Sequence, residues 1–315
     1  MTPRTKLIKG ALLLTLVIAL GNFDVGAVGA AILGSTETFN PNSDAYVDEE
    51  NPDINYGISN IKLITDNYNT GKKYSYLKFD ISTIPSEMII TSANLYLWCY
   101  ARQGGGYTRI YAYSVENDDW NESTITWNNR PGAVTLLSEH SGDTLAWWNW
   151  DVKAFVESEH GGDKTVSLCL IPGDLNDYIV EFRSKEWWNP EYRPYLKVTY
   201  ALPATIDLYP DTLTLKINNG TIWFTAYIEL PSGYSVEDID VSTVRLIVGT
   251  DNVPAELNQN KIDDYDGDAI PDLMLRFKTR ADQVLANVGE YEAKVIGEVA
   301  GVPFQGSDTI RVSDY

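Results

Sequence analysis

Hydrophobic and polar residues alternate over short stretches of this chain, and clusters of Gly, Asn, Asp and Pro separate the stretches. Alternation with a period of two is typical of strands that bury one face. It predicts a first series of strands at Ser75–Ile81, Ala93–Ala101, Tyr107–Val115, Leu145–Val152, Thr165–Ile171 and Tyr195–Tyr200. A second series follows at Ile206–Leu208, Thr212–Ile217, Ile222–Leu230, Val244–Val248, Leu273–Lys278, Tyr291–Gly297 and Asp308–Val312. Helical character is restricted to one turn within Asp151–Glu159, so we predict an all-β protein.

A domain boundary is expected at Ala201–Thr205, between the two series of strands. Eight of the nine Trp lie between Trp98 and Trp188, so the composition changes at this point. The length of 315 residues suits two domains. We predict a jelly-roll-like β-sandwich over residues 31–201 and a second, smaller β-sandwich over residues 202–315.

The first 30 residues have the pattern of an export signal. Basic residues precede the apolar stretch Ala11–Leu20, and the small residues of Val28–Ala30 offer a cleavage site. An uncleaved membrane anchor is the alternative. No later stretch reaches the length of about 18 apolar residues that a membrane-spanning helix requires. We therefore expect a secreted protein without a membrane span in its mature chain.

The formal charge of −20 disfavours nucleic acid as a partner, because an acidic surface repels phosphate. It also disfavours anionic glycans unless cations bridge the contact. A solvated or salt-adapted surface explains the same acidity. Export permits a disulfide between Cys99 and Cys169, but two buried thiols fit their strand-like surroundings equally well.

Four motifs of the first region stand in a fixed order, and they are the segments Asp44–Gly57, Tyr76–Leu95, Trp120–Pro131 and Phe182–Tyr200. Together they resemble a DNRLRE domain over about residues 36–200. Such domains occur in archaeal disaggregatase-related surface proteins and in carbohydrate-binding modules that recognise alginate. The resemblance implies a β-sandwich with an accessory role, either binding glycans or building a matrix. Most of the motif residues suit turns and strand ends, so we interpret them as fold determinants.

A row of aromatic residues is the candidate glycan-binding surface. In Ala93–Ala101, Leu95, Leu97 and Cys99 share one face, so Tyr96, Trp98 and Tyr100 lie on the other. If the connection after Ala101 forms a hairpin, these three residues pair with Tyr111, Arg109 and Tyr107 respectively. Aromatic rings stack on the C–H faces of sugars. Trp147, Trp187 and Trp188 are further candidates, whereas Trp148 and Trp150 are expected in the core. The alternative is that other parts of the chain cover the aromatic face.

The second region contains an acidic loop with the spacing of a calcium site. Asp264, Asp266, Asp268 and Asp272 stand at relative positions 1, 3, 5 and 9, and Gly267 permits a tight bend. The loop resembles the calcium loops of dockerin and thrombospondin type 3 repeats. It departs from the EF-hand because Leu275 stands where a bidentate Glu is expected. We predict structural calcium here, with a bare acidic turn as the alternative.

Three classes of function remain. The first is a non-catalytic module that binds extracellular polysaccharide. The second is a structural subunit of an S-layer, sheath or adhesive matrix, which would contact other surface-layer proteins. A polysaccharide-degrading enzyme is the least favoured class. The two histidines lie in separate loops, Ser138–Asp143 and Ser158–Asp163, and only a pair of carboxylates is left for catalysis. We expect these loops to be solvated; a metal site shared between them is the alternative.

Overall fold

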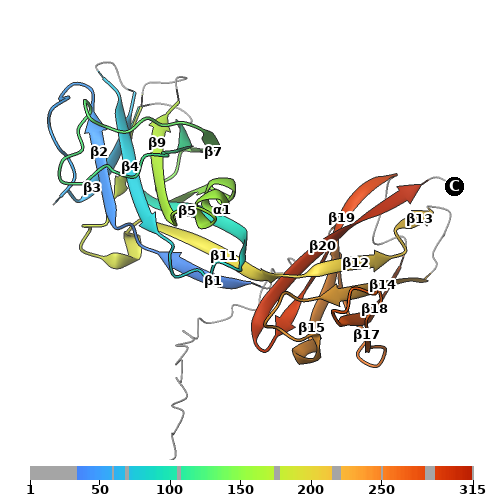
Figure 1. Cartoon of the computed structure of the whole chain (residues 1–315). Coiled ribbons are helices and arrows are strands. Elements are labelled where there is room, and N and C mark those ends of the chain that lie inside the picture. Colours follow the sequence, from blue (N-terminus) through green and yellow to red (C-terminus); the bar gives the residue numbers. More distant parts are fainter. Residues whose placement is uncertain are drawn as a thin grey trace, which may run out of the picture. The chain divides into compact units, whose positions relative to one another are not determined.

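The computed structural model describes residues 34–58, 60–67, 71–104, 108–173, 178–214, 221–249, 251–280 and 288–313. The predicted export signal lies outside the described residues. The all-β prediction is confirmed: the strands form a large mixed sheet of 16 strands and a separate antiparallel sheet of 4 strands (Figure 1). Within the described parts of the chain, no helix has the length and apolar character needed to cross a membrane.

The first region contains one group of antiparallel strands that carries the candidate glycan surface. In order, its members are β1 (Ser35–Phe39), β11 (Tyr195–Pro203), β5 (Ile89–Gln103) and β8 (Trp147–Asp151). β5 is long enough to pair with β11 and β8 in its first part and with β10 in its last part. It therefore connects this group of strands to the rest of the first region.

The other strands of the first region form a second antiparallel group. They are β2 (Ser43–Asp48), β3 (Lys62–Asp66), β4 (Lys73–Asp80), β6 (Thr108–Ser114), β7 (Leu136–Gly142), β9 (Thr165–Pro172) and β10 (Ile179–Arg183). A short helix, α1 (Lys153–His160), and a 3-10 turn, η1 (Pro190–Tyr192), connect strands. The helix has eight residues, more than the single turn predicted within Asp151–Glu159, and it buries Phe155 and Val156.

The second region continues the large sheet and adds the small one. Its part of the large sheet contains β13 (Thr212–Thr214), β15 (Ile239–Val248), β16 (Asp251–Pro254), β19 (Gly289–Val299) and β20 (Val302–Ser313), with a 3-10 turn η2 (Val236–Asp238) before β15. The small sheet contains β12 (Thr205–Tyr209), β14 (Thr221–Glu229), β18 (Asp272–Arg280) and β17 (Lys261–Asp263), in that order. Figure 1 shows these last four strands side by side.

Separate hydrophobic cores lie in the two regions. The main core of the first region contains Trp148 and Trp150, as the sequence predicts, together with Phe79 and Phe182. The core of the second region is built around other aromatic residues, among them Phe277. Fully burying a large apolar side chain contributes about 1.5–3 kcal/mol. Each region therefore has its own source of stability, although the boundary at Ala201–Thr205 stays a prediction.

Both cysteines are buried free thiols, which answers the question the sequence left open. Burial raises the pKa of Cys99 and of Cys169 to about 12. The two thiols therefore stay protonated and behave as small hydrophobic groups.

Candidate functional site

The alternation in β5 places three aromatic side chains on the outer face of their sheet. Leu95, Leu97 and Cys99 are completely buried. Tyr96, Trp98 and Tyr100 occupy the intervening positions and are half-buried. The predicted phase of this strand is therefore confirmed.

The hairpin predicted between β5 and β6 is wrong. β5 pairs with β8, β10 and β11, whereas β6 pairs with β7 and β9. Arg109 and Tyr111 therefore lie on a strand that does not adjoin Trp98 and Tyr96. Arg109 is 3.5 Å from Glu139 on β7 instead of stacking on Trp98. Tyr107, the last residue of the predicted set on this strand, lies outside the described residues.

Other aromatic residues take the places that β6 was expected to fill. Tyr195 of β11 stands opposite Tyr96, and Trp147 of β8 stands opposite Trp98. Tyr96 and Tyr195 stack with ring centroids 4.8 Å apart, and Trp147 meets Tyr195 edge-on at 5.1 Å. Trp98 lies 5.6 Å from Trp147 and 4.9 Å from Tyr192 in the 3-10 turn η1. We call these five residues the aromatic face.

The polar residues beside these rings also point outward. Asn149 stands opposite Tyr96, and Asn94 stands between Lys197 and Asp151 in the next row. Asn149, Asp151 and Lys197 are exposed. Amide, carboxylate and ammonium groups beside stacked rings are the donors and acceptors that read sugar hydroxyls.

An arginine continues the row of rings beyond Trp98. The guanidinium of Arg183 lies 3.5 Å from the ring centroid of Tyr100 and 3.4 Å from that of Trp187. Trp187 in turn contacts Trp188, which is 75% exposed. Burial lowers the pKa of Arg183, but a guanidinium remains charged in proteins. The structure thus brings Tyr100, Trp187 and Trp188 together through a residue that the sequence analysis did not select.

Glu181 fixes the position of Tyr100. It accepts hydrogen bonds from the Tyr100 hydroxyl and from Lys62 Nζ, the latter at 2.9 Å. Burial acts to raise the pKa of Glu181, but these two hydrogen bonds outweigh it and the pKa is lowered. Burial, and then the hydrogen bond to Glu181 and the charge of that carboxylate, raise the pKa of Tyr100. The carboxylate is therefore ionised and occupied in holding the ring, which leaves it unsuited to act as an acid or base.

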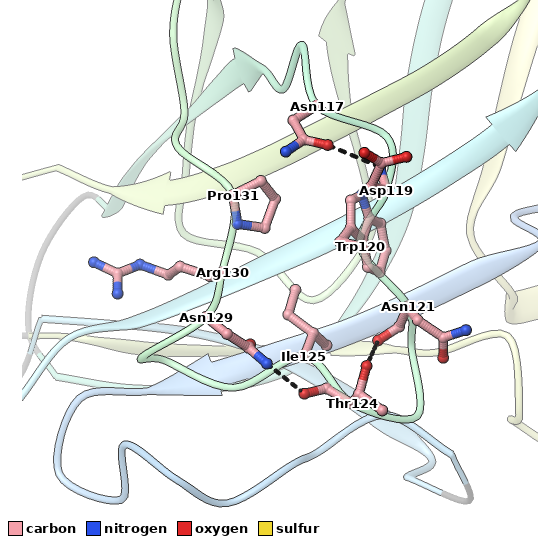
Figure 2. A pocket seen from close by; sticks show the side chains of 9 residues that line it. All are labelled: Asn117, Asp119, Trp120, Asn121, Thr124, Ile125, Asn129, Arg130 and Pro131. Atoms are coloured by element: carbon pink, nitrogen blue, oxygen red, sulfur yellow. Dashed lines mark hydrogen bonds between the residues drawn. The ribbon is translucent and has the colours of Figure 1, made fainter.

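A pocket of about 280 Å³ lies in the Trp120–Pro131 motif (Figure 2). The groups that line it bind one another: Asn129 Nδ2 donates to Thr124 O at 2.9 Å, and Asn117 Oδ1 accepts from Asp119 N at 2.9 Å. Lys78 Nζ donates to the carbonyl of Trp120 at 2.7 Å. These contacts hold the loop itself, which supports the interpretation of the motif as a fold determinant.

Arg193 lies in the last of the four motifs, and its side chain contacts the loop that precedes it. Its Nε donates to Trp187 O at 2.7 Å, whereas Glu186 and Glu181 pair with Lys185 and Lys62. Arg193 therefore fixes the loop that carries Trp187 and Trp188.

The prediction of solvated loops around the two histidines is wrong, because His140 lies in β7 and His160 is a buried residue at the end of α1. His140 stacks on Trp148 with ring centroids 4.6 Å apart, and burial lowers its pKa. His160 Nε2 lies 3.0 Å from Pro85 O. Neither histidine belongs to a cluster of metal-ligating groups within the described residues.

The acidic loop folds around its own carboxylates. Asp264 accepts hydrogen bonds from Gly267 N at 2.7 Å and from Ala269 N at 3.1 Å. Gly267 has a φ of 84°, in the left-handed region that favours glycine, as the tight bend requires. Asp272 accepts from Tyr265 N at 2.9 Å and is buried.

Two sets of carboxylates in and beside this loop could hold a metal ion. Carboxylate oxygens of Asp264, Asp266 and Asp272 lie within 4.8 Å of one another, and so do those of Glu229, Asp266 and Asp268. Burial, and then the charges of Asp268 and Asp266, raise the pKa of Glu229. Sequence spacing could not indicate Glu229, because it comes from β14, far from the loop in the chain.

Comparison with known proteins identifies the first region. The model of carbohydrate-binding module family 96 matches residues 35–200. A gellan lyase from Bacillus sp. is 24% identical over 189 residues, which are 58% of this chain and 8% of that protein. The chain thus spans a small part of this relative.

Likenesses among solved structures are distant. A DUF4785 family protein from Legionella pneumophila is 10% identical, with 87% of this chain and 65% of that chain covered and a TM-score of 0.24. For β-glucuronidase 3 of Bacteroides uniformis the identity is 12%, the coverage 83% and 28%, and the TM-score 0.22. Neither overlap is close enough to inform the fold or the function.

Proposed function

Because this chain belongs to carbohydrate-binding module family 96, we propose that its aromatic face binds an extracellular polysaccharide and that the protein catalyses no reaction itself. The observation that carries this proposal is the contact of four aromatic rings on one outward sheet face with a fifth ring, Tyr192, from the turn η1. Rings fixed by a sheet lose little freedom when a sugar stacks on them.

A binding role, and not catalysis, fits the charged groups beside these rings. Glu181 is engaged with Tyr100 and Lys62, and Arg183 lies between two rings. These contacts keep Glu181 and Arg183 engaged in orienting neighbouring side chains, so neither group is placed to transfer protons to a substrate. Exposed Asn149 and Lys197 can instead bond sugar hydroxyls.

We infer that the protein works outside the cell. The pattern of residues 1–30 supports export, and the acidic composition suits a solvated surface protein. We also infer that the acidic loop of the second region holds calcium, since hard oxygen ligands at this spacing suit that ion. Its role would be structural, fixing the loop ahead of β18.

Affinity electrophoresis against a panel of polysaccharides tests the glycan proposal. Gellan belongs in the panel because of the similarity to a gellan lyase. We expect at least one polysaccharide to retard the chain and the double variant Trp98→Ala, Tyr195→Ala to abolish the retardation. Tyr111→Ala is the matched control, since Tyr111 lies on β6. Absence of retardation on every polysaccharide would favour the matrix-subunit alternative, and release of reducing sugar would overturn the non-catalytic role.

A further inference from the structure

The small sheet of the second region has an outer face that differs from the aromatic face. In β14, Ile222, Phe224 and Ala226 point into the core. Trp223 and Thr225 occupy the alternate positions and are half-buried. Tyr209 of β12, which is 66% exposed, stands opposite Thr225, and Thr225 stands opposite Arg276 of β18. Trp223 stands opposite Lys278.

Two cations flank the indole on this face. The guanidinium carbon of Arg276 lies 4.7 Å from the ring centroid of Trp223, and Nζ of Lys278 lies 5.5 Å from it. Arg276 also donates to Gln259 Oε1 at 3.0 Å. Among the residues that the structure describes, no carboxylate forms an ion pair with either cation. We call Tyr209, Trp223, Thr225, Arg276 and Lys278 the cationic face.

Two cations without a carboxylate partner are unexpected in a chain with 44 acidic and 24 basic residues. Charges more than about 8 Å away are largely screened at physiological ionic strength, so the net charge of the chain does not decide what binds here. Arg276 and Lys278 are neighbours on one face of β18, whereas Asp207 and Glu229, carboxylates of the same face, stand in other rows of the sheet. A guanidinium beside an ammonium is the arrangement that recognises carboxylate and sulfate groups.

We propose that the cationic face is a second glycan-binding site, which takes the carboxylate or sulfate groups of an anionic polysaccharide. Arg276 and Lys278 bind the acidic group, and Trp223 lies against both cations. The exposed ring of Tyr209 lies two strand spacings from Arg276, about 10 Å away. It is placed to stack on a neighbouring sugar of the same chain. This site lies outside the residues that match the carbohydrate-binding module, so it is independent of the aromatic face.

Matched polysaccharides separate this site from the first one. The full chain is run through gels that contain polygalacturonate or its methyl ester, and through gels that contain dextran sulfate or dextran. Each pair shares a backbone and differs in charge. All measurements are made in a Trp98→Ala, Tyr195→Ala background, so that a failure of the aromatic face does not affect the result.

We expect at least one charged polymer to retard the protein, and its uncharged counterpart to retard it far less. Arg276→Gln with Lys278→Gln should weaken this retention about tenfold, because hydrogen bonds to a charged group are lost. Lys153→Gln with Lys294→Gln removes the same two charges from other surfaces and should leave retention unchanged. Exchanging the cations, Arg276→Lys with Lys278→Arg, should preserve most of it.

The proposal is overturned if neither charged polymer retards the protein, or if the two glutamine double variants behave alike. Vesicles with and without phosphatidylglycerol provide a further check. If the face binds the anionic vesicles but neither charged glycan, it is a membrane contact and the proposal fails. Self-association at low salt that disappears in the Arg276→Gln, Lys278→Gln variant, without glycan retention, would assign the face to a second copy of the chain.

Discussion

The two β-regions share one pattern of alternating strands but place their charged side chains differently. In the first region the lysines near the sheets are paired: Lys73 lies 2.9 Å from Asp66, and Lys185 lies 3.0 Å from Glu122. In the second region Arg276 and Lys278 contact an indole, and several aspartates gather in the acidic loop. These lysines of the first region are thus paired with carboxylates, whereas Arg276 and Lys278 form no ion pair among the residues that the structure describes.

The same contrast applies to aromatic residues. The first region has enough rings to fill its core and to cover the outer face of β5, β8 and β11. The second region presents a single indole, Trp223, between cations. Strand alternation alone therefore does not determine what a sheet face binds, because the outward positions are free to differ.

The largest effect is expected from replacing a core aromatic residue, and it tests whether the two regions unfold separately. Trp150 is completely buried and its Nε1 donates to Ile110 O at 2.9 Å, while Phe277 is buried in the core of the second region. Replacing either one by Ala should lower the free energy of unfolding of its own region by about 3–5 kcal/mol. Hydrogen exchange measured by mass spectrometry reports protection for each region. Equal loss of protection in both regions would contradict a boundary at Ala201–Thr205.

Calcium binding should raise the stability of the second region and leave that of the first region unchanged. At about one hundred times its dissociation constant, an ion that binds only the folded state adds about 2.7 kcal/mol to the free energy of unfolding. We expect calorimetry to show a lower melting temperature of the second region after chelation. Asp264→Asn with Asp266→Asn should remove the difference, whereas Glu237→Gln with Glu256→Gln should preserve it. A melting temperature indifferent to chelation would exclude structural calcium.

Each region also contains a glycine that a larger residue cannot replace without movement. A Cβ on Gly57 would lie 2.0 Å from Glu122 O, and one on Gly306 would lie 2.1 Å from Ala204 O. Alanine at either position should destabilise its region by about 1–3 kcal/mol in chemical denaturation. Gly132→Ala, with no atom within 4 Å of the new Cβ, is the control and should change little. A neutral Gly57→Ala would show that the Glu122 loop can shift.

The smallest expected effect is a pH dependence confined to the first region. Burial, and then the charge of Glu186, raise the pKa of Asp44 well above its ordinary value. The folded state then holds this proton more tightly than the unfolded state. The contribution of Asp44 to stability therefore falls as pH rises above the ordinary value of 3.8, by at most about 1.4 kcal/mol per pH unit.

Asp44→Asn should remove this dependence, because the amide does not ionise and its oxygen can still accept from Lys185 N, now 2.8 Å from the carboxylate. Urea denaturation at a series of pH values should show the variant gaining stability over the wild type as pH rises. A difference that stays constant with pH would mean that Asp44 has the same pKa in both states.

The sequence predicts local structure well here and long-range pairing poorly. The phase of β5, the burial of Trp148 and Trp150 and the bend at Gly267 follow from alternation and from backbone preference. The partner strands of β5 do not follow, because the chain leaves this strand and returns to it much later, in β8, β10 and β11. For the same reason Tyr192, Tyr195, Arg183 and Glu229 were not identified as site residues. Tyr195, Arg183 and Glu229 become neighbours of their sites through pairing between distant strands, and Tyr192 is carried there by the turn ahead of β11.

The two buried free thiols allow the opening of the first region to be measured by chemical modification. Cys99 and Cys169 both lie in that region, fully shielded and with pKa values raised to about 12, so alkylating reagents should not modify them in the folded state. Modification then requires at least local unfolding. The rate at which a thiol-reactive probe modifies the intact protein would therefore measure the opening of the first region. Opening of the second region would give no signal, because both cysteines lie in the first. No engineered label is needed.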